Sequence, residues 1–355
     1  MALKAHGLDS TGQLYKINSF EFHRNEDIIR LTTDPAYDQT AFEQLMEIKG
    51  NSDHSKLIEM LDVLNDESSS MDEEVFVRYF DPENIAYWLA FQLLTGNTDT
   101  QSRNAYLYSP QNSDCWYLLD WDNDGMLRRK EREIIQFSDS ESWERGVSNY
   151  WGNVLFRRCL QTESFRQLLD TMDELYAYMN QDRIESMLAH YRGVTEEYVW
   201  RMPDRLYVPI THEQYEEVLE SIWPEIDEDY DYYWESYHNP MPFYIGTPSL
   251  QNGVLQLSWD TSYDFNAEDI SYTVELARDY QFRQMVYREE HVVLPMTQTA
   301  APAAGQYFIR VRATNASGYT QDAFDYYVID SGKVYGVKCF YIQPDGTVVE
   351  DTYEE

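Results

Sequence analysis

The sequence predicts an α+β fold over residues 1–240 and an all-β sandwich over residues 241–330. The first observation is that apolar residues recur at helical spacing through most of residues 142–237. The second is a short strand pair over residues 105–121. The third is a change to a period of two after the Pro-containing linker at residues 239–242. With 355 residues, 43% of them hydrophobic, the chain is long enough for two packed cores, so two domains are expected.

The strongly negative net charge of the chain limits the classes of molecule that it can bind. The formal net charge is −36, and a surface this acidic repels nucleic acid and anionic membranes. Residues 1–20 are polar and mixed, so they do not read as a signal peptide, and no run of eighteen apolar residues predicts a membrane span. The three cysteines are too few for a disulfide framework, which favours buried free thiols.

A helix is predicted immediately before Gly96. Asp81 suits the N-cap position and Pro82 the first helical position. The positions that recur at helical spacing after Pro82 are Ile85, Trp88, Leu89, Gln92 and Leu93. Gly96 can end the helix, and one face of it is expected to be buried.

A hairpin is predicted after this helix. Residues 105–108 and 115–121 read as its strands, joined by a polar turn at residues 111–114. Because side chains alternate along a strand, Asp120 and Asp122 are expected on the same side. Two carboxylates on one face suit a hard divalent cation such as Mg²⁺.

The loop between the helix and the hairpin contains Asp99 and, five residues later, Asn104. An Asp, an Asn at this spacing and a further Asp about twenty residues on form the arrangement of a protein-kinase catalytic loop. There the first Asp orients the accepting hydroxyl, while the Asn and the second Asp hold the metal. Asp122 is in the position of the second Asp. The alternative is that these Asp-rich loops are ordinary solvated turns.

Residues 80–126 resemble the core of the CotH (spore-coat protein H) kinases, which are secreted or envelope-associated atypical kinases of bacteria and fungi. The motifs that carry the resemblance are Asn97-Thr98-Asp99, Asn104 before Tyr106-Leu107-Tyr108, and Asp120-Trp121-Asp122 before Gly125. It extends more weakly over residues 10–240. It implies an atypical protein-kinase-like fold with a truncated small lobe and a mainly helical large lobe.

The resemblance also implies metal-dependent transfer of phosphate from ATP to a protein hydroxyl. Asp99 would orient the acceptor, and Asn104, Asp120 and Asp122 would hold Mg²⁺ or Mn²⁺. Lys16 and Asn104 would contact the nucleotide. The expected partners are a nucleotide and a protein substrate. The expected location is secreted or associated with the cell envelope, with a signal peptide lost together with an upstream segment.

Lys16 closes a Gly-x-Leu-Tyr-Lys pattern that CotH relatives also carry, 83 residues before Asp99. It is the candidate for pairing the phosphates, with Glu43 or Glu47 of a predicted helix as its ion-pair partner; the alternative is an ordinary surface lysine. Only fifteen residues precede Lys16, and they contain no glycine-rich hairpin. Either the chain is a piece of a longer protein or it has lost this lid. The rival interpretation is therefore a degenerate, surface-displayed binding or scaffolding module.

Beyond Gly125, residues 126–135 carry a basic cluster. It would either bind nucleotide or an acidic substrate, or balance nearby carboxylates. The helices predicted for the large lobe cover residues 153–160, 163–178, 183–198 and 213–223. The acidic and aromatic residues 225–237 are expected to form a solvated helix end with buried rings, with a carbohydrate or calcium site as the alternative.

Residues 241–330 resemble a fibronectin type III domain. Short strands recur at the spacing of a sandwich, Trp259 lies late in the second of them, and Tyr307 fills the tyrosine-corner position. Such modules are spacers or binding platforms, so the candidate ligand here is a cell-surface or multidomain partner. Residues 331–355 are predicted to form a terminal hairpin, with its turn at residues 344–346, and an acidic tail.

Overall fold

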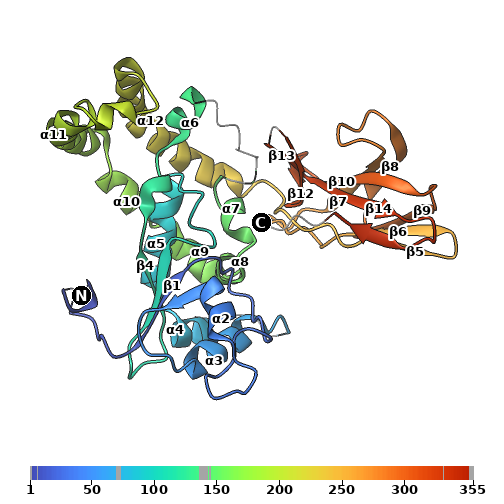
Figure 1. Ribbon diagram of the computed structural model, residues 1–355, viewed down its shortest axis with the longest axis horizontal. Helices are drawn as coiled ribbons and strands as arrows, with labels where there is room; N and C mark the ends of the chain where they lie inside the picture. Colours follow the sequence, from blue (N-terminus) through green and yellow to red (C-terminus); the bar gives the residue numbers. More distant parts are fainter. Residues whose placement is uncertain are drawn as a thin grey trace. The chain divides into compact units, whose positions relative to one another are not determined.

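The computed structural model describes residues 2–5, 7–68, 73–135, 143, 145–330 and 332–351. The chain divides into two compact units, one formed by Met1–Phe137 with Asn149–Tyr233 and the other by Ser138–Ser148 with Trp234–Glu355. Helices dominate the first unit and strands the second (Figure 1). Within the described residues, no helix is long and apolar enough to cross a lipid bilayer.

The first unit contains one antiparallel sheet with the strand order β2-β1-β3-β4. Its strands are β1 (Gln13–Ile17), β2 (Met46–Ile48), β3 (Ala105–Ser109) and β4 (Tyr117–Asp120). The predicted hairpin forms the β3–β4 side of this sheet. Because Asn104 directly precedes β3 and Asp122 closely follows β4, the two residues lie at the same end of the sheet.

Strand β2 departs from the sequence prediction. The helical pattern over residues 38–64 predicts two helices, and the second of them forms as α3 (Ser55–Leu64). The first, α2 (Gln39–Leu45), ends where β2 begins. Pairing of Ile48 with Tyr15 on β1 is a contact between residues distant in sequence, and it overrides the local helical pattern.

The helix before the loop forms as predicted. α5 (Pro82–Leu94) begins after Asp81, whose carboxylate accepts a hydrogen bond from the Asn84 backbone nitrogen at 2.8 Å. Asn84 also fixes α5 to β4, since its Nδ2 donates to Leu118 O at 3.0 Å and its Oδ1 accepts from Leu118 N at 2.8 Å. Gly96 follows the helix with a φ of 55°, a conformation that favours glycine. α5 lies alongside β4 in Figure 1.

The other helices of the first unit are α1 (Ala2–Ala5), α4 (Glu73–Tyr79), α6 (Arg129–Ile134), α8 (Val154–Leu160), α9 (Glu163–Leu169), α10 (Met172–Tyr178), α11 (Gln181–Val199) and α12 (His212–Ser236). In Figure 1, α2, α3 and α4 lie toward one end of the unit and α11 lies toward the other. The short α7 (Ser148–Trp151) spans the division between the units.

Two predicted helix boundaries differ from the structure. The helix expected over residues 163–178 is two helices, α9 and α10, with Asp170 and Thr171 between them. The helix predicted over residues 213–223 is longer and continues through Pro224 to Ser236, so it includes most of the residues expected to form its solvated end. Proline removes one helical hydrogen bond, but Ile226 just beyond it is fully buried in an apolar cluster. Tertiary packing therefore sustains α12 beyond its proline.

The second unit has two main sheets around one core. Their strand orders are β5-β6-β9 and β15-β14-β10-β7-β8, with β11 beside β10, and β12 and β13 pair separately. The strands are β5 (Ser249–Gln251), β6 (Val254–Ser258), β7 (Ile270–Ala277), β8 (Met285–Val292), β9 (Met296–Ala300), β10 (Gly305–Asn315), β11 (Thr320–Asp322), β12 (Tyr326–Ile329), β13 (Gly332–Tyr335), β14 (Val337–Ile342) and β15 (Val348–Glu350). Both sheets contribute side chains to the core, for example Leu257 from β6 and Val311 from β10.

The segment expected as a terminal hairpin is built into this unit. β14 pairs with β10 from Gly305↔Ile342 to Arg310↔Val337, and β15 pairs with β14. Tyr307 is fully buried, and its hydroxyl donates to the Ala303 carbonyl at 2.5 Å, which is the hydrogen bond of a tyrosine corner. Met241, in the predicted linker, is also fully buried.

Candidate functional site

The loop between α5 and β3 places Asp99 and Asn104 in direct contact. Asn104 Nδ2 donates to Asp99 Oδ2 at 2.8 Å. Asn104 has a left-handed φ of 58°, which asparagine tolerates better than most residues. An ionised carboxylate only accepts hydrogen bonds, so the nitrogen of the amide must face Asp99. The Oδ1 atom of Asn104 is therefore the atom left to face a cation.

Gly125 holds this loop close to the residues that follow β4. It is buried at the end of η1 (Asn123–Gly125), the 3-10 turn that begins directly after Asp122. A Cβ atom added to Gly125 would lie 2.7 Å from Asn97 Oδ1 and 3.1 Å from Asp99 Cβ, so only glycine allows this approach. The segments that carry Asp99 and Asp122 therefore converge at one end of the sheet.

A buried amide network lies beneath the loop. Asn97 Nδ2 donates to Gln92 Oε1 at 2.8 Å and approaches Asn123 Oδ1 at 3.4 Å. Gln92 Nε2 donates to Asp120 Oδ1 at 3.2 Å. Gln92 and Asn97 each expose only 1% of their surface. Because buried amides need their partners, these bonds fix the loop relative to β4.

Gln92 and Asn123 were not among the site residues predicted from the sequence. Gln92 occupies one of the positions on the buried face of α5, and a polar side chain at such a position is the signal of a buried network. Asn123 carries no comparable signal, because its contact with Asn97 depends on the turn that follows β4.

Asp120 lies at the edge of this network. Burial raises the pKa of its carboxyl above the usual value, while hydrogen bonds from Asn123 and Gln92 lower it in part. Asp120 is nevertheless exposed at the end of β4, so one oxygen is held by Gln92 while part of the side chain reaches solvent. A cation bound here would favour the ionised carboxylate.

Asp122 is not part of β4. The strand ends at Asp120, and Asp122 adopts a left-handed conformation with φ 57° and ψ 55°. The alternation expected of a continuous strand therefore does not set the direction of both carboxylates, which corrects that expectation. Asp122 is exposed, and no hydrogen bond or ion pair engages its carboxylate within the described part of the chain. It is free to bind a cation.

Comparison with known proteins identifies the family. Residues 1–233 match the model of the CotH kinase protein family. The chain belongs to this family. The match confirms the resemblance inferred from the three motifs, and membership indicates a kinase-like fold for the first unit.

The CotH chain was also compared with solved structures and with curated proteins. The twitchin kinase region from C. elegans is a similar solved structure, with 17% sequence identity and a TM-score of 0.19. The alignment covers 27% of this chain and 20% of the twitchin chain. No curated protein matches the sequence.

Lys16 of the CotH chain is engaged in contacts near the end of β4. Its Nζ lies 3.7 Å from Glu47 Oε1 and 5.8 Å from the centre of the Trp121 ring. Of the two predicted ion-pair partners, the structure pairs it with Glu47, which comes from β2 and not from a helix. Trp121 lies between Asp120 and Asp122 in the sequence, so Lys16 reaches the segment just after the end of β4.

Lys16 and Asp120 project from opposite faces of the sheet. Lys16 is paired with Tyr106 on β3, and Tyr106 is paired with Leu119 on β4. Paired residues share a face, and Asp120 is the next residue along β4, so it projects from the other face. A nucleotide that contacts both Lys16 and Asp120 must therefore pass around the end of β4.

The basic cluster after Gly125 is largely paired with carboxylates. Arg128 Nε donates to Glu131 Oε2 at 2.7 Å, and this bond, followed by the charges of Asp124 and Asp99, raises the pKa of Arg128. Asp99 has a basic partner of its own outside this cluster, since Arg103 Nε lies 3.3 Å from Asp99 Oδ1. These contacts favour the balancing role, and binding of nucleotide or an acidic substrate stays a prediction.

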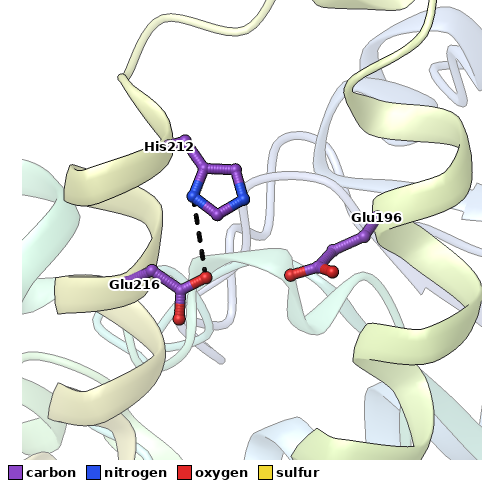
Figure 2. Close-up of side chains that lie close together, drawn as sticks. All are labelled: Glu196, His212 and Glu216. Carbon is purple, nitrogen blue, oxygen red and sulfur yellow. Dashed lines mark ion pairs between the residues drawn. The ribbon is translucent and has the colours of Figure 1, made fainter.

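One group of metal-ligand side chains occurs elsewhere in the described residues. Glu196 on α11 and His212 and Glu216 on α12 bring three ligand atoms within 4.8 Å of one another (Figure 2). Arg192 donates to Glu196 Oε1 at 2.6 Å and also to Glu216 Oε1. A guanidinium between two carboxylates neutralises them, so we interpret this group as an ion-pair network that joins the two helices.

Asp99, Asp120 and Asp122 are spaced more widely than that group, since no other trio of described His, Cys, Asp or Glu ligands lies within the same limit. A kinase site does not require such closeness, because phosphate and water oxygens complete the coordination of Mg²⁺. The donors here, two strand-end carboxylates and Asn104 Oδ1, are all oxygen atoms. They fit a hard divalent cation.

Proposed function

We propose that this CotH-family chain is an atypical protein kinase that transfers phosphate from ATP to a protein hydroxyl with Mg²⁺ or Mn²⁺. The observation that carries the proposal is the contact between Asp99 and Asn104 at 2.8 Å, next to the close approach of Gly125 to Asp99. These contacts connect Asp99, which is proposed to orient the acceptor hydroxyl, to the proposed metal ligands. Family membership supports the same reaction class.

In this proposal Asp99 orients the acceptor hydroxyl and receives its proton. The acceptor oxygen forms a bond to the γ-phosphorus of ATP as the bond from that phosphorus to the bridging oxygen breaks, which releases ADP. Asn104 Oδ1 and the Asp122 and Asp120 carboxylates would hold the divalent cation, which neutralises developing phosphate charge. Lys16 would contact the phosphates from the Trp121 end of the strand, exchanging part of its contact with Glu47.

Metal and nucleotide binding test this proposal. A ligand that binds only the folded state raises its melting temperature. Mg²⁺ with ATP should therefore raise the melting temperature of the wild-type protein, and Asp122→Asn should lose most of this rise. Asp114→Asn, in the exposed turn between β3 and β4, is the matched control and should keep it. An equal rise in all three proteins would show diffuse binding by the acidic surface.

A second candidate function is a degenerate binding or scaffolding module. The observation that favours it is the position of Lys16, which is paired with Glu47 on the face opposite to Asp120. A protein of this kind would bind neither ATP nor Mg²⁺ at Asp122. The melting experiment distinguishes the two candidates. For a binding or scaffolding module, Mg²⁺ with ATP is expected to cause no rise in melting temperature that depends on Asp122.

We further propose that the second unit is a fibronectin type III-like sandwich that binds a cell-surface or multidomain protein partner. The strand orders β5-β6-β9 and β8-β7-β10-β14 and the hydrogen bond from Tyr307 to Ala303 support this assignment. The proposed location is secreted or associated with the cell envelope. Selective labelling of surface proteins on intact cells tests this location.

A further inference from the structure

Helix α12 places a buried carboxylate against the segment that follows Asp122. Glu225 exposes 5% of its surface, and its two oxygens accept hydrogen bonds from the backbone nitrogens of Arg129 at 3.1 Å and Lys130 at 2.9 Å. Ser221 Oγ, one turn earlier on α12, donates to the same carboxylate at 2.9 Å. The charge is satisfied inside the protein, as a buried carboxylate requires.

A second carboxylate on α12 contacts both sides of the candidate site. Asp229, whose side chain is 7% exposed, accepts a hydrogen bond from the Arg129 guanidinium through Oδ1. Its Oδ2 faces Gly96, where an added Cβ atom would lie only 2.5 Å away. Asp229 therefore contacts the beginning of the loop that carries Asp99 as well as the segment that follows Asp122.

Backbone and apolar contacts connect the same two segments. The Leu127 backbone nitrogen donates to the Thr95 carbonyl at 2.8 Å. Leu127 also packs against the cluster that contains Ile226 of α12. Residues 95–97 and 125–130 are thus joined to each other and to one side of α12.

We propose that Glu225 and Asp229 are positioning residues for the reaction, a role that rests on the proposed kinase function. They hold residues 95–97 and 125–130 against α12, and so fix the separation between Asp99 and Asp122. In many kinases the segment after the metal-binding Asp is ordered by phosphorylation, which pairs added negative charge with arginine. Here Asp229 pairs with the Arg129 guanidinium, and Glu225 accepts hydrogen bonds from the backbone nitrogens of Arg129 and Lys130, so residues 125–130 are held without an added phosphate.

The test compares Glu225→Gln with Glu228→Gln. Glutamine keeps the shape of Glu225 but turns an NH₂ group toward one of its backbone donors. Loss of a buried hydrogen bond to a charged acceptor should speed amide hydrogen exchange in residues 125–130 on the order of tenfold to a hundredfold. Glu228 binds the same arginine but is 64% exposed, so Glu228→Gln should exchange like the wild type. Asp229→Asn is the second test variant and should resemble Glu225→Gln.

The rate of phosphate transfer measures whether Glu225 positions the reacting groups. We expect kcat to fall about tenfold or more in Glu225→Gln, because displacement of Asp99 from Asp122 by a fraction of an ångström disturbs the reacting geometry. The melting temperature of the protein without ligands should change much less than after loss of a core side chain. Glu228→Gln should keep the wild-type kcat.

Each outcome decides the proposal. The proposal that Glu225 and Asp229 hold residues 125–130 is overturned if amide exchange there is unchanged in both Glu225→Gln and Asp229→Asn. It is also overturned if Glu228→Gln speeds exchange as much as they do. Faster exchange with wild-type kcat overturns the positioning role. If the wild-type protein transfers no phosphate, the proposed kinase function fails whatever the exchange results are. The measurement is then whether Mg²⁺ with ATP slows amide hydrogen exchange in residues 122–130. Absence of that protection in the wild type also overturns the positioning role.

Discussion

Asn104 donates a hydrogen bond to Asp99 across the turn that leads into β3, with 2.8 Å between Nδ2 and Oδ2. This contact uses the nitrogen of the amide, and its oxygen has no hydrogen-bond partner among the described residues, so one residue can orient Asp99 and also offer a metal ligand. Its left-handed backbone is what brings the amide to this place.

Substitutions at Asn104 should separate its backbone role from its side-chain role. At a φ of 58° glycine is unstrained, whereas alanine should lower the free energy of unfolding by about 1 kcal/mol relative to glycine. Both variants lose the amide, so both should lose phosphate transfer by tenfold or more. Urea unfolding and initial transfer rates measure the two effects. A fully active glycine variant would remove Asn104 from the site.

Gly125→Ala should disturb the site by crowding alone. The new Cβ would lie 2.7 Å from Asn97 Oδ1, and the resulting shift should cost about 1–3 kcal/mol of unfolding free energy and reduce transfer. Gly193→Ala, in α11, is the control, because a Cβ there meets open space and should be neutral or stabilising by up to about 1 kcal/mol. Thermal melting of both variants checks the expectation, and equal effects would contradict it.

Much of the fold could be predicted from the sequence where local signals act alone. Asp81 and Pro82 mark the start of α5, and alternation and turn residues mark the β3–β4 hairpin. Strand β2 could not be predicted, because it depends on pairing with a strand distant in sequence.

The site was predictable to a lesser degree. Spacing and family resemblance placed Asp99, Asn104 and Asp122 on one loop system, and the structure brings their segments together. The support from Glu225 could not be predicted, since it comes from a helix about a hundred residues away in sequence. Its acidic surroundings also look like a solvated helix end, which is what residues 225–237 were expected to form.

His54 should make the stability of the protein depend on pH. It is fully buried, with Nδ1 2.8 Å from Tyr15 Oη and Nε2 3.1 Å from Tyr37 Oη, and burial lowers its pKa from 6.5 to about 4. Between these values the unfolded chain binds the proton and the folded chain does not, so stability falls as the pH falls from about 6.5 to 4. The protonation of His54 should therefore lower the free energy of unfolding by about 3 kcal/mol at pH 4 relative to pH 7.

The comparison with His54→Gln isolates this effect, because other titrating groups are common to both proteins. The wild-type advantage in unfolding free energy, measured in urea, should shrink toward acid pH by that amount. A difference that stays constant from pH 7 to pH 4 would show that His54 is not held neutral.

Lys16→Ala should distinguish a phosphate ligand from a surface lysine. If Lys16 contacts the phosphates, its loss should raise the KM for ATP several-fold or more, whereas Glu47→Gln, which removes its partner, should have a smaller effect. Steady-state kinetics with varied ATP measures both. An unchanged KM and kcat in Lys16→Ala would leave the lysine outside the site.

Transfer of labelled γ-phosphate from ATP to protein acceptors tests the central claim most directly. We expect metal-dependent transfer by the wild-type chain that falls by a hundredfold or more in Asp99→Ala and Asp122→Asn, and that persists in Asp114→Asn. Equal transfer by the wild type and Asp99→Ala, or none by the wild type with either Mg²⁺ or Mn²⁺, would contradict the account.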